Sequence, residues 1–211
     1  AAGAGSLAGA SVAMNGAGDG VAAVRLANGS TSTVAAARYV SGWAGAAIVA
    51  SGDILGAPRV GVATNGNAQL AFLETALGHT VLRAARWGGV AWSTPAAIDG
   101  PDDTSAFDLT VAADGVAWVV YRGSSFYVNR FDGASWQGYE YLYGGTGAGA
   151  PSAVVYGTNG LLAAWSVAST MRVANVAVAA PAVADAGGTG DAASVGGSGG
   201  AQQLELRELR K

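Results

Sequence analysis

Pairs of short apolar runs, each pair divided by a tight turn, recur four times along the chain. Every turn contains Asp-Gly or Asn-Gly, which favour type I′ hairpins because both central residues need a positive φ. The turn glycines Gly20, Gly66, Gly115 and Gly160 lie 45 to 49 residues apart. The pattern therefore predicts four β-hairpins at a regular period, as in a repeat protein.

Further apolar runs follow each hairpin, and none of them shows the 3.6-residue periodicity of an amphipathic helix. Four strands repeated near this period are typical of one blade of a β-propeller, whereas the alternative, an Ig-like sandwich pair, requires no such regularity. We therefore expect an all-β fold, a β-propeller of about four four-stranded antiparallel blades. The third runs are residues 33–40, 80–87, 125–131 and 171–178, and the fourth runs are residues 44–50, 93–98 and 138–142.

The fourth unit has no fourth run, so a strand from elsewhere has to complete its blade. Propellers commonly close by lending a terminal strand to the opposite end, which removes exposed edges. We therefore expect residues 1–10 to be the closing strand. A half-ring that joins a larger ring by pairing with a second copy is the alternative to a closed ring of four. Within a propeller region of residues 1–183, the predicted blades are residues 11–57, 58–106, 107–150 and 151–183.

The composition changes after the fourth unit. Residues 184–200 consist of Gly, Ala, Ser, Asp, Thr and Val without a core-forming pattern, which predicts a flexible linker. Residues 201–211 are rich in helix-forming residues and predict a short C-terminal helix. Such a helix would serve as a docking or oligomerising contact, the alternative being a frayed terminus.

Composition limits the chemistry that this chain can perform. It has no cysteine and one histidine, His79, which excludes disulfides, thiolate metal sites and a catalytic thiol. The net charge is −3, whereas binding to nucleic acid requires clustered Lys and Arg. No apolar run reaches the roughly 18 residues that would predict a membrane span. We therefore expect no cofactor, no metal, no nucleic acid partner and no membrane span.

Only 12% of the residues are charged, and Gly is abundant with 34 residues. Together with the lack of cysteine, this composition suits an extracellular or particle-surface protein. The chain begins at Ala1, which we interpret as the processed start of a secreted protein.

In the first three units an Arg in the third run is followed closely by a Trp. A sugar site needs a flat apolar surface and a rigid planar donor, and Trp and Arg provide both. Repetition by blade would add avidity. The alternative role is structural, with the Trp packed between blades and the Arg covering it. The candidate ligand-binding residues of this pattern are Arg38, Trp43, Arg86, Trp92, Arg130 and Trp136.

Tyrosines concentrate in the third unit. Tyr139 and Tyr141 belong to the run Tyr-Glu-Tyr-Leu-Tyr, and Tyr is favoured at recognition surfaces, so both are further candidate ligand-binding residues. The acidic segment 99–103 carries three aspartates that could hold calcium, but Asp-Gly-Pro-Asp is a good turn sequence in its own right and we favour the turn.

The segments Arg130-Phe-Asp-Gly-Ala-Ser-Trp136 and Arg86-Trp-Gly-Gly-Val-Ala-Trp92 carry a family resemblance. The units resemble the propeller repeats of secreted bacterial proteins and, more loosely, lectin propellers. This resemblance implies a propeller fold and sugar sites between blades, built from an Arg and an aromatic platform. The Ser-x-Asp-x-Gly-x-x-Trp box of sialidase-type propellers does not occur.

Catalytic motifs are scarce. There is no Gly-x-Ser-x-Gly elbow, and Glu74 and Glu140 are the only glutamates before the C-terminal tail. We therefore expect a non-enzymatic recognition or adhesion module that binds a glycan or other cell-surface ligand. The first alternative is a structural or decoration subunit of an extracellular or virion assembly, oligomerised or docked through residues 201–211. A hydrolase on a propeller scaffold is the weakest of the three interpretations.

Overall fold

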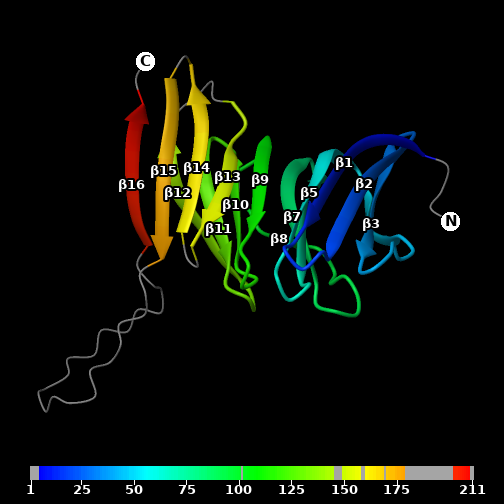
Figure 1. Cartoon of the computed structure of the whole chain (residues 1–211). Coiled ribbons are helices and arrows are strands. Elements are labelled where there is room, and N and C mark those ends of the chain that lie inside the picture. Colours follow the sequence, from blue (N-terminus) through cyan, green and yellow to red (C-terminus); the bar gives the residue numbers. More distant parts are fainter. Residues whose placement is uncertain are drawn as a thin grey trace, which may run out of the picture.

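The computed structural model describes residues 5–100, 102–144, 149–157, 160–168, 170–178 and 202–209, and every regular element in them is a β-strand. The strands form four separate antiparallel sheets of four strands each (Figure 1). We refer to these sheets as blades 1 to 4, in chain order. This arrangement confirms the predicted all-β fold with four antiparallel blades.

Each blade is an up-and-down meander whose strands pair in chain order. The four hairpins form where they were predicted, but their turns differ from the predicted type I′. The positive φ values belong to Gly18, Gly66, Gly115 and Gly157, whereas Gly20 and Gly160 begin β2 and β14. The third runs form the third strands. Blade 1 contains β1 (Ser6–Met14), β2 (Gly20–Asn28), β3 (Thr31–Tyr39) and β4 (Ala47–Gly52), and blade 2 contains β5 (Ile54–Val62), β6 (Ala68–Ala76), β7 (His79–Trp87) and β8 (Ala96–Ala97). Blade 3 contains β9 (Ala106–Val111), β10 (Ala117–Arg122), β11 (Ser125–Phe131) and β12 (Trp136–Gly144), and blade 4 contains β13 (Ser152–Tyr156), β14 (Gly160–Val167), β15 (Thr170–Val178) and β16 (Gln202–Leu209).

The apolar core is divided among the three joints between consecutive blades. One buried cluster joins blades 1 and 2, a second joins blades 2 and 3, and a third joins blades 3 and 4. Each blade therefore uses one face, which we call the forward face, against the following blade and the other, the backward face, against the preceding blade. Because side chains alternate along a strand, both faces must be apolar in blades 2 and 3.

The innermost strands approach one another closely where glycine removes a side chain. A Cβ on Gly9 of β1 would collide with Ala57 of β5, and a Cβ on Gly61 of β5 would collide with Val111 of β9. Glycine at these two positions lets the backbones of neighbouring blades come together.

The prediction of a short C-terminal helix is wrong, because residues 202–209 form the strand β16, which pairs with β15. The helix rested on the intrinsic preference of Glu, Leu, Arg and Gln. Leu204 and Leu206 also fit the period of a strand, and the unpaired edge of β15 offers eight residues of backbone pairing. Tertiary pairing overrides local preference here.

The prediction that residues 1–10 close the propeller by joining blade 4 is also wrong for the residues of this segment that the structure describes. Ser6–Met14 is one continuous strand that pairs with β2 and belongs to blade 1, while β16 supplies the fourth strand of blade 4. A hairpin closed by a short turn forms more readily than a pairing across the whole chain. The predicted linker, residues 184–200, lies outside the described residues.

The four blades form an open array. Figure 1 shows blade 1 and blade 4 at opposite ends, with blades 2 and 3 between them. No buried cluster of the described residues combines blades 1 and 4. Within the described ranges, no helix has the length and hydropathy to cross a membrane.

Candidate functional site: a polar cleft between blades 2 and 3

The arginines of the first two blades reach across a joint to the following blade. The guanidinium of Arg38 lies 5.7 Å from the ring centre of Trp87, and that of Arg86 lies 5.4 Å from the ring centre of Phe131. Burial lowers the pKa of Arg38, and the neighbouring carboxylate of Asp19 opposes that shift. Each arginine therefore acts at the joint that follows its own blade.

The predicted tryptophans pack on an aromatic residue of their own blade. Trp43 packs edge-on against Tyr39, Trp92 packs edge-on against Trp87, and Trp136 packs against Phe131. The structure thus pairs each of these two arginines with the aromatic corner of the next blade: Arg38 with the corner that holds Trp92, and Arg86 with the corner that holds Trp136.

Arg130 differs from the other two arginines. Its guanidinium lies over Trp118 of its own blade, 5.6 Å from the ring centre. Trp118 is 1% exposed and belongs to the buried cluster between blades 3 and 4. This joint is filled by aromatic side chains, including Phe126 stacked on Trp165 with ring centres 4.8 Å apart.

Two cavities meet in the joint between blades 2 and 3. An inner cavity of about 150 Å³ lies among the hairpin turns, and an outer one of about 510 Å³ lies between β7, β8 and the β11–β12 turn. Gln69 and Arg86 line both cavities. They pair directly across β6 and β7, so the sheet register places them side by side.

Gln69 is unusual among the residues that line these two cavities. It is 3% exposed, and its Oε1 atom has no hydrogen-bond partner. A buried amide oxygen without a partner costs free energy, so such an atom at the wall of a cavity marks a position for a ligand donor.

The inner cavity is otherwise polar. Asn65, Asn67 and Asp114 line it from the hairpin turns of blades 2 and 3. The Oδ1 atom of Asp114 accepts a hydrogen bond from the backbone N–H of Val116 at 3.0 Å, which orients the carboxylate. The inner cavity therefore combines a guanidinium, three amides and a carboxylate.

The outer cavity presents an aromatic wall. Phe131 and Trp136 line it together with the hydroxyls of Ser93 and Ser135. The turn before Trp136 is held by Asp132, whose carboxylate accepts hydrogen bonds from the backbone N–H groups of Ser135 and Ala134. These hydrogen bonds lower the pKa of Asp132, so the carboxylate stays charged and the turn stays closed at neutral pH.

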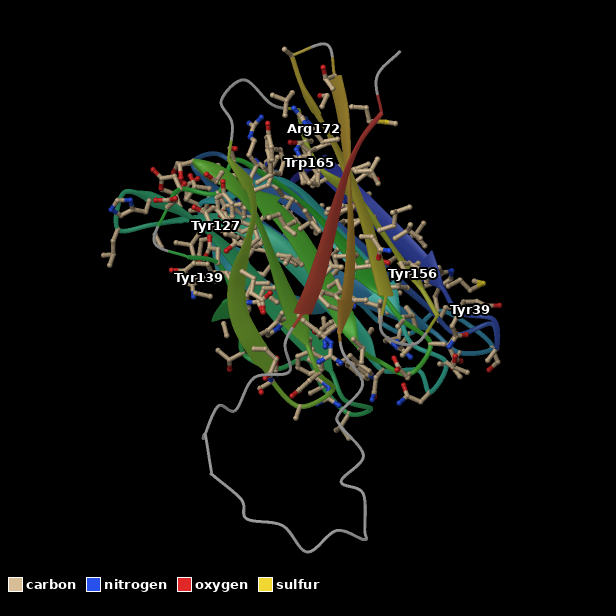
Figure 2. All side chains as sticks on the ribbon, turned by 90° about the vertical axis from the view of Figure 1, so that its left-hand side faces the viewer. Tyr39, Tyr127, Tyr139, Tyr156, Trp165 and Arg172 are labelled. Carbon is tan, nitrogen blue, oxygen red and sulfur yellow. The ribbon has the colours of Figure 1, made fainter. Side chains whose placement is uncertain are left out.

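Tyr139 and Tyr141 lie outside the cleft, towards the other end of blade 3. They are 47% and 57% exposed, and both rings pack edge-on against Tyr127. Figure 2 shows Tyr139 beside Tyr127. The Tyr127 hydroxyl donates a hydrogen bond to Asp102 at 3.1 Å. The tyrosines and the arginine–tryptophan corners are therefore separate surfaces.

Of the predicted ligand-binding residues, Arg86 and Trp136 line the two cavities, and sequence reasoning did not single out the other polar residues there, Gln69, Asn65, Asn67 and Asp114. One signal was present in the repeat. The register position beside the arginine holds Val21 in blade 1 and Trp118 in blade 3, so a polar Gln69 at that position departs from the pattern. The described residues contain no group of three or more His, Cys, Asp or Glu side chains that could hold a metal ion.

Comparisons with known proteins identify the fold class. The chain is similar to a glycoside hydrolase of the GH130 family of mannoside phosphorylases that targets β-1,2-mannosidic linkages in Candida mannan, with a TM-score of 0.50, 11% identity and coverage of 82% of this chain and 67% of that one. It is also similar to the polysaccharide lyase Uly1, with a TM-score of 0.53, 9% identity and coverage of 94% of this chain and 49% of that one. A glycosyl hydrolase from Bacteroides ovatus matches with a TM-score of 0.47 at 10% identity, covering 82% of this chain and 67% of that one.

The likenesses to the GH130 enzyme and to the lyase support a propeller-type fold. No family model and no curated protein matches the sequence. The chain spans about half the length of the lyase.

The expectation of a non-enzymatic recognition or adhesion module is contradicted by these comparisons, because the structures with this fold are those of carbohydrate-active enzymes. The scarcity of familiar catalytic motifs does not decide the question, since fold neighbours at 9% to 11% identity share the backbone and not the local sequence.

Proposed function

We propose that this chain is a carbohydrate-active enzyme that cleaves a glycosidic linkage in the cleft between blades 2 and 3. The observation that carries the proposal is Gln69, a buried amide whose Oε1 atom lacks a partner at the point where two cavities meet. The activities of the hydrolase and lyase with similar folds support the same class of substrate.

The two cavities provide the contacts that a sugar chain needs. Gln69 Oε1 would accept a hydrogen bond from a hydroxyl, and the Arg86 guanidinium would donate to a hydroxyl or a carboxylate. Trp136 supplies an aromatic wall for the C–H face of a second sugar ring in the outer cavity. A substrate bound in this way would lie across the joint, with one sugar unit in each cavity.

Asp114 is the residue to which we assign proton transfer. It is the one carboxylate among the described residues that line the two cavities. Its Oδ1 atom is held by the N–H of Val116, so the carboxyl keeps one orientation. In its protonated form, Asp114 would donate its proton to the glycosidic oxygen as the bond to the leaving sugar breaks, and a water molecule would add to the anomeric carbon of the other sugar.

The test is an activity measurement on oligosaccharides and polysaccharides, both neutral and uronic-acid-containing. Release of reducing ends and absorbance of unsaturated products detect hydrolysis and elimination, respectively. Asp114→Asn keeps the size of the side chain and the acceptor for Val116, and should abolish cleavage while the substrate still binds. Asp53→Asn, an exposed change outside the two cavities, is the matched control and should retain full activity. Equal activity of the two variants on a cleaved substrate would reject the role of Asp114.

A further inference from the structure

The backward face of blade 1 is apolar and has no blade against it. Cross-strand pairing places Ala10, Val24, Ala35 and Ile48 in one row across β1 to β4. Val12, Ala22 and Ala37 form the next row. Val12 is 69% exposed and Ile48 is 62% exposed. No charged residue occupies either row, although a sheet face that meets water normally alternates to polar residues.

The forward face of blade 4 is similar. One row contains Val154, Leu162 and Asn175 and reaches Glu205 on β16, and the next contains Ser152, Ala164 and Val173 and reaches Arg207. Val154 is 53% exposed and Leu162 is 41% exposed. The equivalent of Leu162 in blade 3 is Trp118, which is 1% exposed because blade 4 covers it. Leu162 of blade 4 thus lies exposed at a position that blade 3 buries, on a face that is apolar over β13 and β14 and becomes polar towards β16.

A hydrogen bond recurs between the innermost strands at two of the three joints. The backbone N–H of Val60 in β5 donates to Ser11 Oγ of β1, and that of Ala153 in β13 donates to Asp108 Oδ2 of β9 at 2.9 Å. Ser11 and Asp108 occupy the same register position of their hairpins, opposite Ala23 and Val120. The equivalent residue of blade 4 is Ser152, opposite Ala164.

The donors of these hydrogen bonds are equivalent as well. Val60 pairs with Leu70, two positions beyond the last strand pair and three beyond the turn hydrogen bond between Ala63 and Asn67. Ala153 pairs with Ala163, three positions beyond the corresponding pair of Tyr156 and Gly160. In blade 1 this position belongs to Val12, which pairs with Ala22. A blade 1 placed on blade 4 would therefore bring the Val12 N–H to the Ser152 hydroxyl.

We propose that two copies of this chain join head to tail into one ring, with the forward face of blade 4 of each copy packed on the backward face of blade 1 of the other. Both new joints repeat the contact that already occurs three times within the chain. The ring has eight blades, within the range of known propellers. A heterologous contact of this kind closes when the rotation returns to the first copy.

A second copy of this chain fits the free faces of blades 1 and 4 better than an unrelated partner does. The two free faces are the two halves of a single repeating joint, so each face has its complement on the same chain. Figure 2 shows Tyr156 of blade 4 and Tyr39 of blade 1 on the same side of the molecule, beside the hairpin turns of their blades. Head-to-tail packing keeps the hairpin turns of all eight blades at one end.

The test measures the mass of the 211-residue chain in solution by sedimentation velocity. The wild-type chain should sediment with twice the mass of one chain. Leu162→Lys changes the forward face of blade 4, Val12→Glu changes the backward face of blade 1, and each should abolish the dimer. Val90→Glu, at a residue that is 90% exposed in a turn, is the matched control and should leave the dimer intact. Circular dichroism checks that all variants fold.

Mixing the two variants distinguishes a head-to-tail ring from other dimers. A mixture of Leu162→Lys and Val12→Glu chains should regain the dimer, because one joint is then fully wild type and the other pairs Lys with Glu. A monomeric wild-type chain would overturn the proposal and leave these faces to blades outside residues 1–211. A larger oligomer, or a dimer that one of the two single variants leaves intact, would also overturn it. The mass measurement tests the ring and the cleavage assay tests the proposed enzymatic function, so each proposal can fail without the other.

Discussion

The joint between blades 2 and 3 and the joint between blades 3 and 4 use the same positions for different purposes. In the first, Gln69 lies beside Arg86 and two cavities meet. In the second, Trp118 lies beside Arg130 and the arginine stacks on the tryptophan. The backbone register is equivalent, so the side chain at one position decides whether the joint is open or sealed.

The comparison separates structural from functional uses of one motif. Arg130 covers an aromatic core, whereas Arg86 forms the wall of a cavity next to an unsatisfied amide. A repeat protein can therefore keep the same arginine in successive blades and place a site at only one joint. The departure from the repeat, Gln69, identifies that joint.

The largest effect on stability is expected at the sealed joint. Trp118→Ala would leave a cavity among Phe126, Val120 and Arg130, and should lower the free energy of unfolding by about 3–5 kcal/mol. Urea unfolding measures this change. The same measurement on Val90→Ala, a change in an exposed turn, should give a difference close to zero. A loss below about 1 kcal/mol for Trp118→Ala would show that this joint is not tightly packed.

Gln69→Leu, in the joint between blades 2 and 3, should weaken substrate binding without lowering the free energy of unfolding. The substitution removes a buried oxygen without a partner, so the free energy of unfolding should stay equal or rise. Substrate affinity should fall at least about tenfold, because the ligand hydroxyl loses its acceptor. Isothermal titration with a cleaved oligosaccharide, using the inactive Asp114→Asn background, measures the affinity. Unchanged affinity would remove Gln69 from the site.

Asn129 provides a buried polar contact in the joint between blades 2 and 3. Its Nδ2 donates to the carbonyl oxygen of Ile98 at 2.7 Å, and the side chain is 3% exposed. Asn129→Leu would leave that carbonyl without its donor, so the free energy of unfolding should fall by about 1–3 kcal/mol. Urea unfolding provides the value, and an unchanged midpoint would mean that water replaces the amide.

The smallest effect is a pH dependence at the far end of this joint. Burial raises the pKa of Asp99, against hydrogen bonds from the Leu82 N–H and the Thr104 hydroxyl. The folded state therefore binds this proton more tightly than the unfolded state, and the associated stability is lost as the pH rises above about 4. Asp99→Asn remains neutral, so between pH 4 and 7 its Tm should decline less than that of the wild type. Parallel Tm curves for the two proteins would contradict the assignment.

The fold was predictable because it repeats. Alternating apolar runs and the Asp-Gly and Asn-Gly turns define four hairpins, since the turns need glycine and each strand needs apolar residues on both faces. The strands at the two ends of the chain could not be predicted from the repeat. Residues 202–209 carry helix-forming side chains, and only the free edge of β15 makes them a strand.

The site was predictable only in part. Arg86 and Trp136 stand out because they recur, but recurrence cannot separate a cavity wall from a core contact. Gln69, Asn65 and Asp114 come together because two blades meet, and that contact depends on the packing of separate sheets. Their chemistry is therefore visible only in three dimensions.

The most direct test of the central claim is a crystal structure of the Asp114→Asn variant with an oligosaccharide that the wild type cleaves. The account predicts sugar electron density in the joint between blades 2 and 3, with a hydroxyl within hydrogen-bond distance of Gln69 Oε1 and a second ring against Trp136. Density on Tyr139 and Tyr141 with an empty cleft would contradict it.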